Sequence, residues 1–479
     1  MFERHGMFID NELVASAGEV IDVVSPATAE PIGRVTLAVD GDIDRAVAAA
    51  RTAFDTGPWP RMAVDERRAV IARAAELLAP QAPELSELVT NENGVGIRAQ
   101  QGNVASSFEY YGGLPYPEPE YREIVPGMGG MVVREPVGVV GAIVPWNAPV
   151  GLGLGKVLPA LVAGCTVVLK PSPETPLHDY VIAEAFAAAG LPPGVLNVVP
   201  ADRAVSEHLV RHPGVDMISF TGSTAAGRRI GAICGEQIKR VVLELGGKSA
   251  AIITDDVDAA STAAAVLQTG MLLNNGEACM AWTRLLVPRH RHDELVDAFC
   301  DVLSGVKVGD PLDPTTEIGP LVAERQRDRV EGYIRSGLED GAKVVFGGGR
   351  PTGLDRGWFV EPTLFVNADN SMKICREEIF GPVGSVIAYD DEDEAVRIAN
   401  DSNYGLAGGV FTADPERGRA IASRIRAGTI GINSLGVAHC LPFGGYKDSG
   451  IGRCHGPEGF AEFFETKTIG LPPGYEPPR

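Results

Sequence analysis

A carboxylate and a thiol 35 positions apart are the residues of this chain best suited to chemistry. Glu244 lies in the segment Val-Leu-Glu-Leu-Gly-Gly-Lys, and Cys279 lies in Asn-Asn-Gly-Glu-Ala-Cys-Met. A thiolate can attack a carbonyl carbon and form a covalent adduct. A carboxylate can then activate the water molecule that breaks this adduct. We therefore predict a two-stage reaction in which Cys279 acts first and Glu244 second.

The sequence around Cys279 bears on its reactivity in two ways. The thiol follows a polar Asn-Asn-Gly turn, whereas a structural cysteine more often lies within an apolar run, so the context favours a reactive thiol. Glu277 lies two residues earlier, and a nearby anion would disfavour the thiolate and raise its pKa. Two interpretations stay open: the Glu277 side chain points away, or a bound cofactor offsets its charge.

The elements that must position this pair form a regular alternation. Between residues 137 and 243, five short apolar runs alternate with four helical stretches, which indicates a parallel sheet covered on both faces. The same alternation restarts after Gly246-Gly247 and continues to about residue 432, which predicts a second α/β domain. Residues 120–136 are expected to be extended outside the main sheet, and the tail 463–471 to form a strand at a sheet edge.

Polar residues follow several of the predicted strands, at the edge where ligands bind in open α/β sheets. Lys170 could reach a ribose or phosphate, Asn147 could stabilise an oxyanion, and the loop 220–224 opens a helix whose free amides attract phosphate. Each also has a structural interpretation, as a surface lysine, a turn former and a helix cap respectively. The segment Gly151–Lys156 lacks the spacing of a nucleotide loop, and we interpret it as helix packing.

Composition excludes several classes of function. The chain has 479 residues, enough for two or three domains, and a net charge of −21, which disfavours nucleic acid and anionic membranes as partners. No apolar stretch approaches the ~18 residues of a membrane span, and the N-terminus lacks a signal-peptide pattern. The seven cysteines are odd in number and contain no Cys-x-x-Cys, so we expect no disulfide framework, no metal site and a reducing, cytoplasmic location.

Taken together, these segments resemble the aldehyde dehydrogenase superfamily from about residue 8 to 470. Eight motifs occur in the order that the family has, and their combination makes a chance match very improbable. They are Pro-Trp-Asn at 145–147, Lys-Pro-Ser at 170–172, Phe-Thr-Gly-Ser-Thr at 220–224, Leu-Glu-Leu-Gly-Gly-Lys at 243–248, Asn-x-Gly-x-x-Cys at 274–279, Glu-Ile-Phe-Gly-Pro at 378–382, Gly-Thr-Ile-Gly-Ile-Asn at 428–433 and Pro-Phe-Gly-Gly-Tyr-Lys-x-Ser-Gly at 442–450.

The resemblance implies an α/β fold with a variant Rossmann cofactor domain, a second α/β catalytic domain and a small β element for oligomerisation. The implied boundaries are 1–119 and 137–246 for the cofactor domain, 247–448 for the catalytic domain, and 120–136 with 463–479 for the oligomerisation element. The implied activity is oxidation of an aldehyde to the free carboxylic acid, with NAD or NADP as cofactor, in a homodimer or homotetramer.

The resemblance also implies a role for each motif residue. Cys279 would be the nucleophile, and Asn147 with the backbone amide of Cys279 would hold the oxyanion of the thiohemiacetal. Glu244 would activate the water that hydrolyses the thioester. The residues expected to bind the cofactor are Trp146, Lys170, Ser172, Gly222, Ser223, Leu245, Gly246, Glu378 and Phe380.

Three departures from the family pattern concern cofactor and acid–base chemistry. Many NAD-preferring members carry an acid three residues after the strand-end lysine, where this chain has Pro173 followed by Glu174. Residues 201–203, Ala-Asp-Arg, replace a common Gly-x-Gly near the adenine. Cys454 stands where many members have a second acid, which leaves Glu244 as the clearest base.

Two alternative functions and the choice of substrate also follow from the resemblance. Members that transfer the acyl group to coenzyme A commonly lack the acid at position 244, so Glu244 favours hydrolysis over a coenzyme A-acylating enzyme. The intact Cys, Glu and Asn set disfavours a non-catalytic aldehyde or nucleotide binder. The implied substrate entrance is mainly small or apolar, with His439 as its nearest basic residue, and we expect an uncharged aldehyde. The residues implied to line this entrance are parts of 148–152, residues near Tyr110, Ala278 and Met280, and the loop 434–441.

Overall fold

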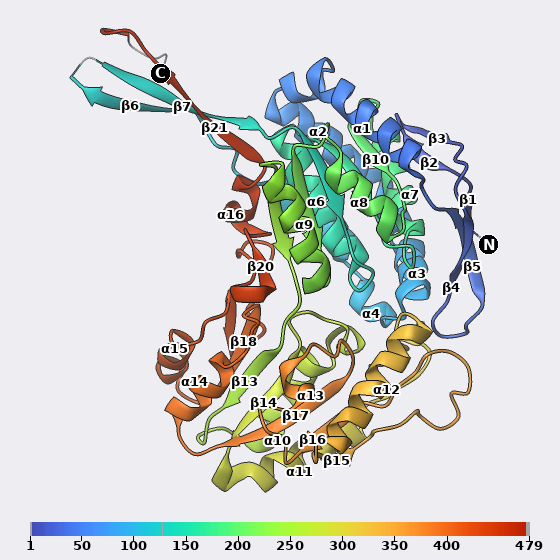
Figure 1. Ribbon diagram of the computed structural model, residues 1–479, viewed down its shortest axis with the longest axis vertical. Coiled ribbons are helices and arrows are strands. Elements are labelled where there is room, and N and C mark those ends of the chain that lie inside the picture. Colours follow the sequence, from blue (N-terminus) through green and yellow to red (C-terminus); the bar gives the residue numbers. More distant parts are fainter. Residues whose placement is uncertain (1, 127, 476–479) are drawn as a thin grey trace.

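Four β-sheets organise the chain in the computed structural model, which describes residues 2–126 and 128–475 (Figure 1). Residue 1 of the expected cofactor domain, and residues 127 and 476–479 of the expected oligomerisation element, lie outside the described residues. Two large sheets of eight and seven strands each carry helices on both faces, and two three-stranded sheets accompany them. This architecture agrees with the α/β fold predicted from the sequence.

The eight-stranded sheet has a parallel centre in which neighbouring strands run side by side in the order β12-β11-β8-β9-β10. Every residue of β8, β9 and β11 is buried, because helices cover both faces of the sheet, and the sequences of these strands are accordingly mostly apolar. The central strands are β8 Val139–Ile143, β9 Thr166–Lys170, β10 Leu196–Val198, β11 Met217–Thr221 and β12 Arg240–Glu244.

Two hydrophobic clusters lie on the two faces of this sheet and account for its helices. One face packs against α1 Asp40–Asp55, α8 Arg203–Arg211 and α9 Thr224–Glu236. The other packs against α2 Val64–Leu78, α3 Ala82–Asn93, α5 Asn103–Gly112, α6 Pro149–Ala163 and α7 Leu177–Ala188. The segment Gly151–Lys156 lies within α6, so its interpretation as a helix is confirmed.

Short strands from the chain ends extend this sheet antiparallel to their neighbours. At one edge β2 Met7–Ile9 pairs with β10 and with β3 Glu12–Val14, and at the other β20 Gly450–Ile451 pairs with β12. A separate small sheet near the N-terminus contains β1 Phe2–Arg4, β5 Pro31–Thr36 and β4 Val20–Val24. Residue 450 therefore returns to the edge next to Glu244.

The seven-stranded sheet has the order β15-β16-β17-β14-β13-β18-β19 and is parallel except at β15. Its strands are β13 Ser249–Ile253, β14 Trp282–Pro288, β15 Lys343–Phe346, β16 Thr363–Val366, β17 Val383–Tyr389, β18 Ala407–Phe411 and β19 Thr429–Ile432. Its helices are α10 Ala259–Val266, α11 His292–Ser304, α12 Glu324–Glu339, the short α13 Lys373–Arg376, α14 Glu392–Asn400 and α15 Pro415–Ala422. Two further short helices, α4 Ile97–Gln100 and α16 Gly456–Ala461, lie elsewhere.

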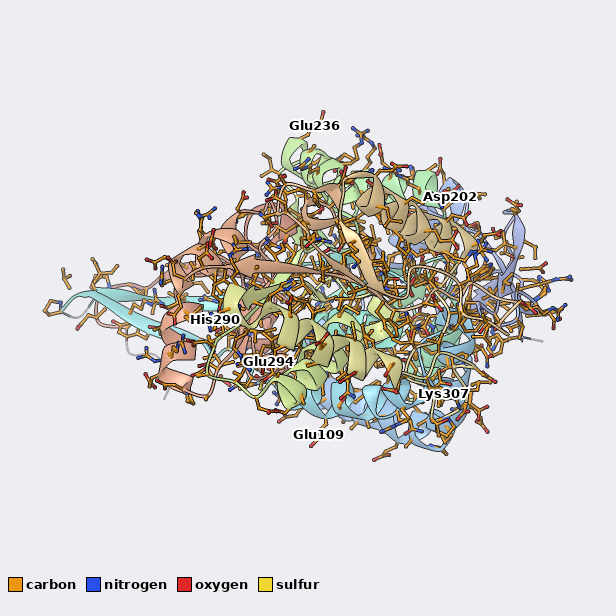
Figure 2. All side chains as sticks on the ribbon, turned by 90° about the horizontal axis from the view of Figure 1, so that it is seen from below. Glu109, Asp202, Glu236, His290, Glu294 and Lys307 are labelled. Carbon is orange, nitrogen blue, oxygen red and sulfur yellow. The ribbon has the colours of Figure 1, made fainter. Side chains whose placement is uncertain are left out.

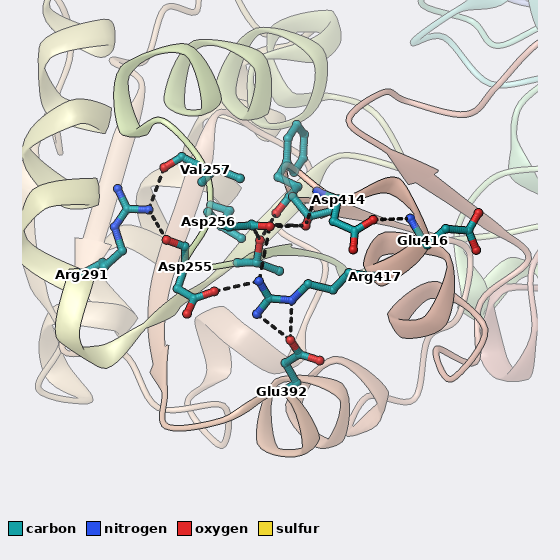
Figure 3. Close-up of polar contacts among 12 residues, drawn as sticks. Asp255, Asp256, Val257, Arg291, Glu392, Asp414, Glu416 and Arg417 are labelled. Carbon is teal, nitrogen blue, oxygen red and sulfur yellow. Dashed lines mark hydrogen bonds and ion pairs between the residues drawn. The ribbon is translucent and has the colours of Figure 1, made fainter.

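A polar network ties the loop after β13 to two helices of the same sheet (Figure 3). The Arg417 guanidinium in α15 donates to Glu392 at the start of α14 and forms an ion pair with Asp255 at 2.8 Å. Arg291 donates to the backbone carbonyls of Asp255 at 3.0 Å and Val257 at 2.7 Å. These contacts at the protein surface hold the loop after β13 against Arg291, α14 and α15.

A three-stranded antiparallel sheet projects from the body of the molecule (Figure 1). It contains β6 Glu120–Val125, β7 Met128–Pro136 and the tail strand β21 Phe464–Gly470, which pairs with β7 over its whole length. Apolar side chains on this arm face solvent, with exposures of 69% for Ile124, 49% for Val125 and 46% for Ile469.

Charged side chains such as Asp202, Glu236 and Lys307 lie on the outside of the molecule (Figure 2). The acidic excess of the chain is therefore largely a property of its surface. Among the described residues, no helix combines the length and apolar character that crossing a membrane requires.

Candidate active site

Ten of the twelve predicted site residues line one cavity of about 250 Å³. The other two, Lys170 and Ser172, line an adjoining cavity of about 390 Å³, and Trp146 borders both. The structure thus brings together residues from distant parts of the sequence. The ten in the first cavity are Trp146, Asn147, Gly222, Ser223, Glu244, Leu245, Gly246, Cys279, Glu378 and Phe380.

Parallel strand ends explain why the polar residues of the first sheet meet in this cavity. Glu244 is the last residue of β12 and pairs in register with Thr221, the last residue of β11. Gly222 and Ser223 follow directly, and Asn147 lies four residues beyond the end of β8. The carboxyl ends of parallel strands form one edge of a sheet, which is the expected ligand-binding edge.

A clamped left-handed turn presents Cys279 to the same cavity. Asn274, Asn275 and Gly276 have φ angles of 49°, 59° and 75°, in the left-handed region that Asn and Gly tolerate best. The Asn275 side chain is buried and donates to the carbonyls of Gly94 and Pro320, both at 3.0 Å. The turn is therefore held by contacts to segments far away in sequence.

Asn147 is oriented by the turn that carries the thiol. Its side-chain Nδ2 donates to the backbone carbonyl of Glu277 at 2.8 Å, and the backbone carbonyl of Asn147 accepts from Asn274 Nδ2 at 3.4 Å. An amide nitrogen carries two N–H groups, so this bond leaves a second donor for a ligand. Asn147 is 6% exposed, which means that this donor acts in a largely dry environment.

The Glu277 side chain is held by the backbone of residue 322, which supports the interpretation that it points away from the thiol. Its side chain is fully buried, and its Oε1 accepts from the backbone N–H of Val322 at 3.2 Å. Burial raises the pKa of this carboxyl well above its ordinary value, which favours its neutral form. Glu277 is a buried structural acid that anchors the turn to residue 322.

Burial also sets the protonation of the reactive thiol and of Glu378. The pKa of Cys279 is raised chiefly by burial and further by the nearby carboxylates of Glu378 and Glu244, so the thiol is protonated at neutral pH. The pKa of Glu378 is raised by burial to about 7, although the Gly247 N–H donates to its Oε1 at 3.0 Å. The nucleophile therefore needs a base to release its proton.

Glu244 is the carboxyl group with unused hydrogen-bonding capacity. It is 3% exposed, and among the described residues neither of its oxygens has a hydrogen-bond partner. Burial raises its pKa to about 8, against the opposing effect of the cations Lys156 and Arg453. A base with this pKa is suited to accept a proton near neutral pH.

The two adjoining cavities have the features that a dinucleotide requires. Ser223 caps α9, accepting from Ala226 N at 3.3 Å, and the start of this helix offers free amides to phosphate. The buried Thr221 hydroxyl lacks a partner among the described residues, so a polar ligand group can satisfy it. A Cβ at residue 246 would lie 2.7 Å from Glu378 Oε2, so Gly246 makes room for that carboxylate at the cavity wall.

The larger cavity has apolar walls at one part and polar side chains at another. Its walls include Ile143, Phe220 and Ile230, which suit a planar base, whereas Lys170 and Ser172 lie where ribose hydroxyls or phosphate would be held. Burial lowers the pKa of Lys170 to about 8. Trp146 stands between the cavities and packs edge-on against Phe380, with ring centroids 5.3 Å apart.

Sequence reasoning missed the residues that α12 contributes to this wall. Gln326 and Arg329 line the smaller cavity, and Gln326 Nε2 donates to the carbonyl of Phe380 at 2.6 Å. Arg329 donates to the carbonyl of Glu378 at 2.5 Å, so the helix holds both predicted cofactor residues in place. The sequence did contain a signal for this helix, because the apolar residues at 330, 333 and 334 have the spacing of one helical face.

Comparisons with known proteins agree with this geometry. The profile of the Aldehyde dehydrogenase family matches residues 13–469. A geranial dehydrogenase of Castellaniella defragrans is 45% identical over 97% of this chain and 100% of its own length. An aldehyde dehydrogenase of Mycobacterium tuberculosis, solved with NAD+, is 47% identical with a TM-score of 0.95 over 99% of both chains. Aldehyde dehydrogenase C of Pseudomonas syringae, a mutant solved with NAD+ and octanal, is 40% identical with a TM-score of 0.94 over 99% of this chain and 98% of its own.

Replacing Glu277 by Gln tests the neutrality of that buried acid. The amide keeps the shape and the acceptor for Val322 N–H, so we expect the rate at which iodoacetamide alkylates Cys279 to change less than about twofold. The rate is measured between pH 7 and 9 by mass spectrometry of the peptide that contains Cys279. An increase of about tenfold or more would show that residue 277 carries a charge that suppresses the thiolate.

Proposed function

The chain belongs to the aldehyde dehydrogenase family, whose NAD-dependent enzymes oxidise aldehydes to carboxylic acids, and on that premise we propose which residues perform each step. Cys279 is the nucleophile, Asn147 the oxyanion donor and Glu244 the base. The observation that carries this proposal is that all three line one cavity, with both oxygens of Glu244 free to accept protons.

In the first stage Cys279 Sγ attacks the carbonyl carbon of the aldehyde, and the thiol proton passes to solvent water. The carbonyl oxygen becomes an oxyanion that accepts hydrogen bonds from Asn147 Nδ2 and from the backbone N–H of Cys279. The C–H bond of the adduct then breaks with loss of a hydride, and the oxyanion collapses to a thioester carbonyl. When bound, NAD supplies the acceptor for that hydride.

In the second stage the Glu244 carboxylate takes a proton from a water molecule. The resulting hydroxide attacks the thioester carbon, the C–S bond breaks, and the acid leaves as Cys279 is restored. The presence of a carboxyl group at position 244, in the cavity that Cys279 lines, favours this hydrolytic outcome over transfer to coenzyme A.

The remaining predicted residues are assigned to the cofactor. Lys170 and Ser172 serve the adenosine ribose, and the loop of Gly222 and Ser223 at the start of α9 serves the pyrophosphate. Glu378 serves the second ribose. The other cofactor residues, which shape the nicotinamide end, are Trp146, Leu245, Gly246 and Phe380.

The substrate that best fits the chain is an uncharged aldehyde of medium or large size. Gly151 lies on α6 one turn beyond Asn147, and a Cβ there would meet nothing within 4 Å. His439 stacks on Tyr110 with ring centroids 5.9 Å apart, and burial lowers its pKa, so it offers no cation to a carboxylated substrate. The similarity to a geranial dehydrogenase and to an enzyme solved with octanal points the same way.

The assembly and location are also proposals. We assign residues 1–119 and 137–246 to the cofactor domain, 247–448 to the catalytic domain, and 120–136 with the tail from 463 to oligomerisation. The exposed apolar side chains of the projecting sheet support its burial against a second copy, in a homodimer or homotetramer. All seven cysteines are free, which supports a reducing cytoplasm.

The pH profile and the Glu244→Gln variant test the role of the base. A base with a pKa of about 8 is protonated and inactive below that pH, so hydrolysis of the thioester should speed up as the pH rises from 6 and level off above about 8. The variant should give a burst of reduced cofactor followed by a steady state slower by about a hundredfold or more. Unchanged steady-state turnover in stopped-flow absorbance would remove Glu244 from this role.

Filling the space at residue 151 tests the proposed substrate class. Gly151→Phe should lower kcat/KM for decanal by about tenfold or more while changing that for propanal by less than about threefold, because only the long chain needs the space. Gly41→Phe is the matched control, since Gly41 also meets nothing within 4 Å but lies in α1. Equal losses on both aldehydes would place the substrate elsewhere.

A further inference from the structure

Three consecutive residues at the end of α3, Glu92, Asn93 and Gly94, are buried although two of them are polar. Asn93 is the last residue of the helix, and Gly94 follows in the left-handed region with a φ angle of 78°. A Cβ at residue 94 would lie 2.6 Å from the carbonyl oxygen of Pro320, so both the turn and the available space require glycine. Buried polar groups are costly unless they are hydrogen-bonded, so their partners show what this segment holds.

Glu92 fixes the end of α3 to the start of α7. Its Oε1 accepts from the backbone N–H of Leu177 at 2.6 Å, and its Oε2 is hydrogen-bonded to Nδ1 of His178 at 2.8 Å. The side chains of Glu92 and His178 are both fully buried. The end of α3 is therefore a fixed point among the helices of the eight-stranded sheet, and the side chain of the next residue has a defined direction.

The Asn93 side chain is oriented at one end and contacts Asn147 at the other. Its Oδ1 accepts from the backbone N–H of Val95 at 3.0 Å and from Gln100 Nε2 at 3.4 Å. Because two donors face the oxygen, Nδ2 is the end that donates to the backbone carbonyl of Asn147, at 3.5 Å. Asn93 is fully buried and lies outside both cavities, so it contacts the proposed oxyanion donor without contacting a ligand there.

Gly94 contacts the turn that carries the thiol. Its carbonyl accepts from Asn275 Nδ2 at 3.0 Å. The backbone carbonyl of Asn147 accepts from the same turn, through Asn274 Nδ2 at 3.4 Å, in addition to its contact with α3. Both contacts to this carbonyl are long for a hydrogen bond, so its orientation depends on the two amides together. Adjacent residues at the end of α3 thus contact the proposed oxyanion donor and the turn of the proposed nucleophile.

We propose that Asn93 is a positioning residue that sets the placement of the oxyanion donor Asn147 relative to the nucleophile Cys279. This inference rests on the proposed roles of Asn147 and Cys279. Asn147 lies in the irregular segment between β8 and α6, outside any strand or helix. Asn93 holds its backbone carbonyl while the Asn147 side chain donates to the carbonyl of Glu277, so the second N–H of that side chain keeps its direction. A misplacement of about 1 Å at such a group can cost about a hundredfold in rate.

Replacing Asn93 by Leu removes this donor and keeps the volume of the side chain. At saturating NAD, kcat/KM for the aldehyde should fall by about tenfold or more. The dissociation constant of NAD should change by less than about twofold, because Asn93 lies outside both cavities. In an Asn147→Ala background the same replacement should lower kcat/KM by less than about twofold, because the group that Asn93 positions is then absent. Steady-state kinetics and calorimetric titration of NAD, on the wild type, both single variants and the double variant, measure these effects.

Asn197→Leu is the matched control. Asn197 is also a fully buried asparagine, and its Nδ2 donates to the backbone carbonyl of Gly194 at 2.8 Å, but it lies in β10 outside both cavities. Its replacement should lower the midpoint of thermal unfolding and change kcat/KM by less than about twofold. If Asn93→Leu does not fold, Asn93→Ala and Asn93→Ser carry the same prediction, since neither side chain has an amide donor.

Two results would overturn the positioning role of Asn93. One is full kcat/KM in a folded Asn93 variant. The other is a double variant in which the two losses multiply, which would show that Asn93 acts independently of Asn147. Unchanged kcat/KM in Asn147→Ala alone would overturn the proposed function, and this inference with it. The single variants therefore distinguish failure of the positioning role from failure of the proposed oxyanion donor.

Discussion

Burial of the Glu244 carboxyl and partial burial of the Cys279 thiol raise both pKa values, so each group must lose a proton before its own step. Glu244 is 3% exposed and lacks a hydrogen-bond partner among the described residues, so its charged form is costly and its pKa rises to about 8. The thiol is kept protonated by the same burial. The thiol must therefore lose its proton before the attack and the carboxyl must lose its proton before the hydrolysis, and both groups face one cavity.

The fold meets this requirement by closing a cavity between two sheets. The first sheet supplies Glu244 and Asn147 from the ends of parallel strands, and the second brings the Cys279 turn and the Glu378–Phe380 segment. Helix α12 spans the boundary: it supports the carbonyls of 378 and 380 on one side and reaches Glu174 with Arg325 on the other. The same helix therefore contributes to the walls of both cavities.

Much of this arrangement could be predicted from the sequence, because its signals are local. Apolar runs marked the buried parallel strands, and polar residues directly after them marked the ligand-binding edge. The direction of the Glu277 side chain could not be predicted, since its partner is the backbone of residue 322. Helix α12 was missed because charged residues dominate it, and the carbonyls that it supports lie far away in sequence: Phe380 is 54 positions from Gln326, and Glu378 is 49 positions from Arg329.

Intact-protein mass measurement of the Glu244→Gln variant, mixed with excess aldehyde and NAD, tests the central claim most directly. If Cys279 forms the thioester and Glu244 is needed to hydrolyse it, the variant gains the mass of one acyl group in place of a hydrogen. Peptide mapping should locate that group on Cys279, and Cys279→Ala should gain nothing. An acyl group on another cysteine, or no adduct while the variant still reduces NAD, would contradict the account.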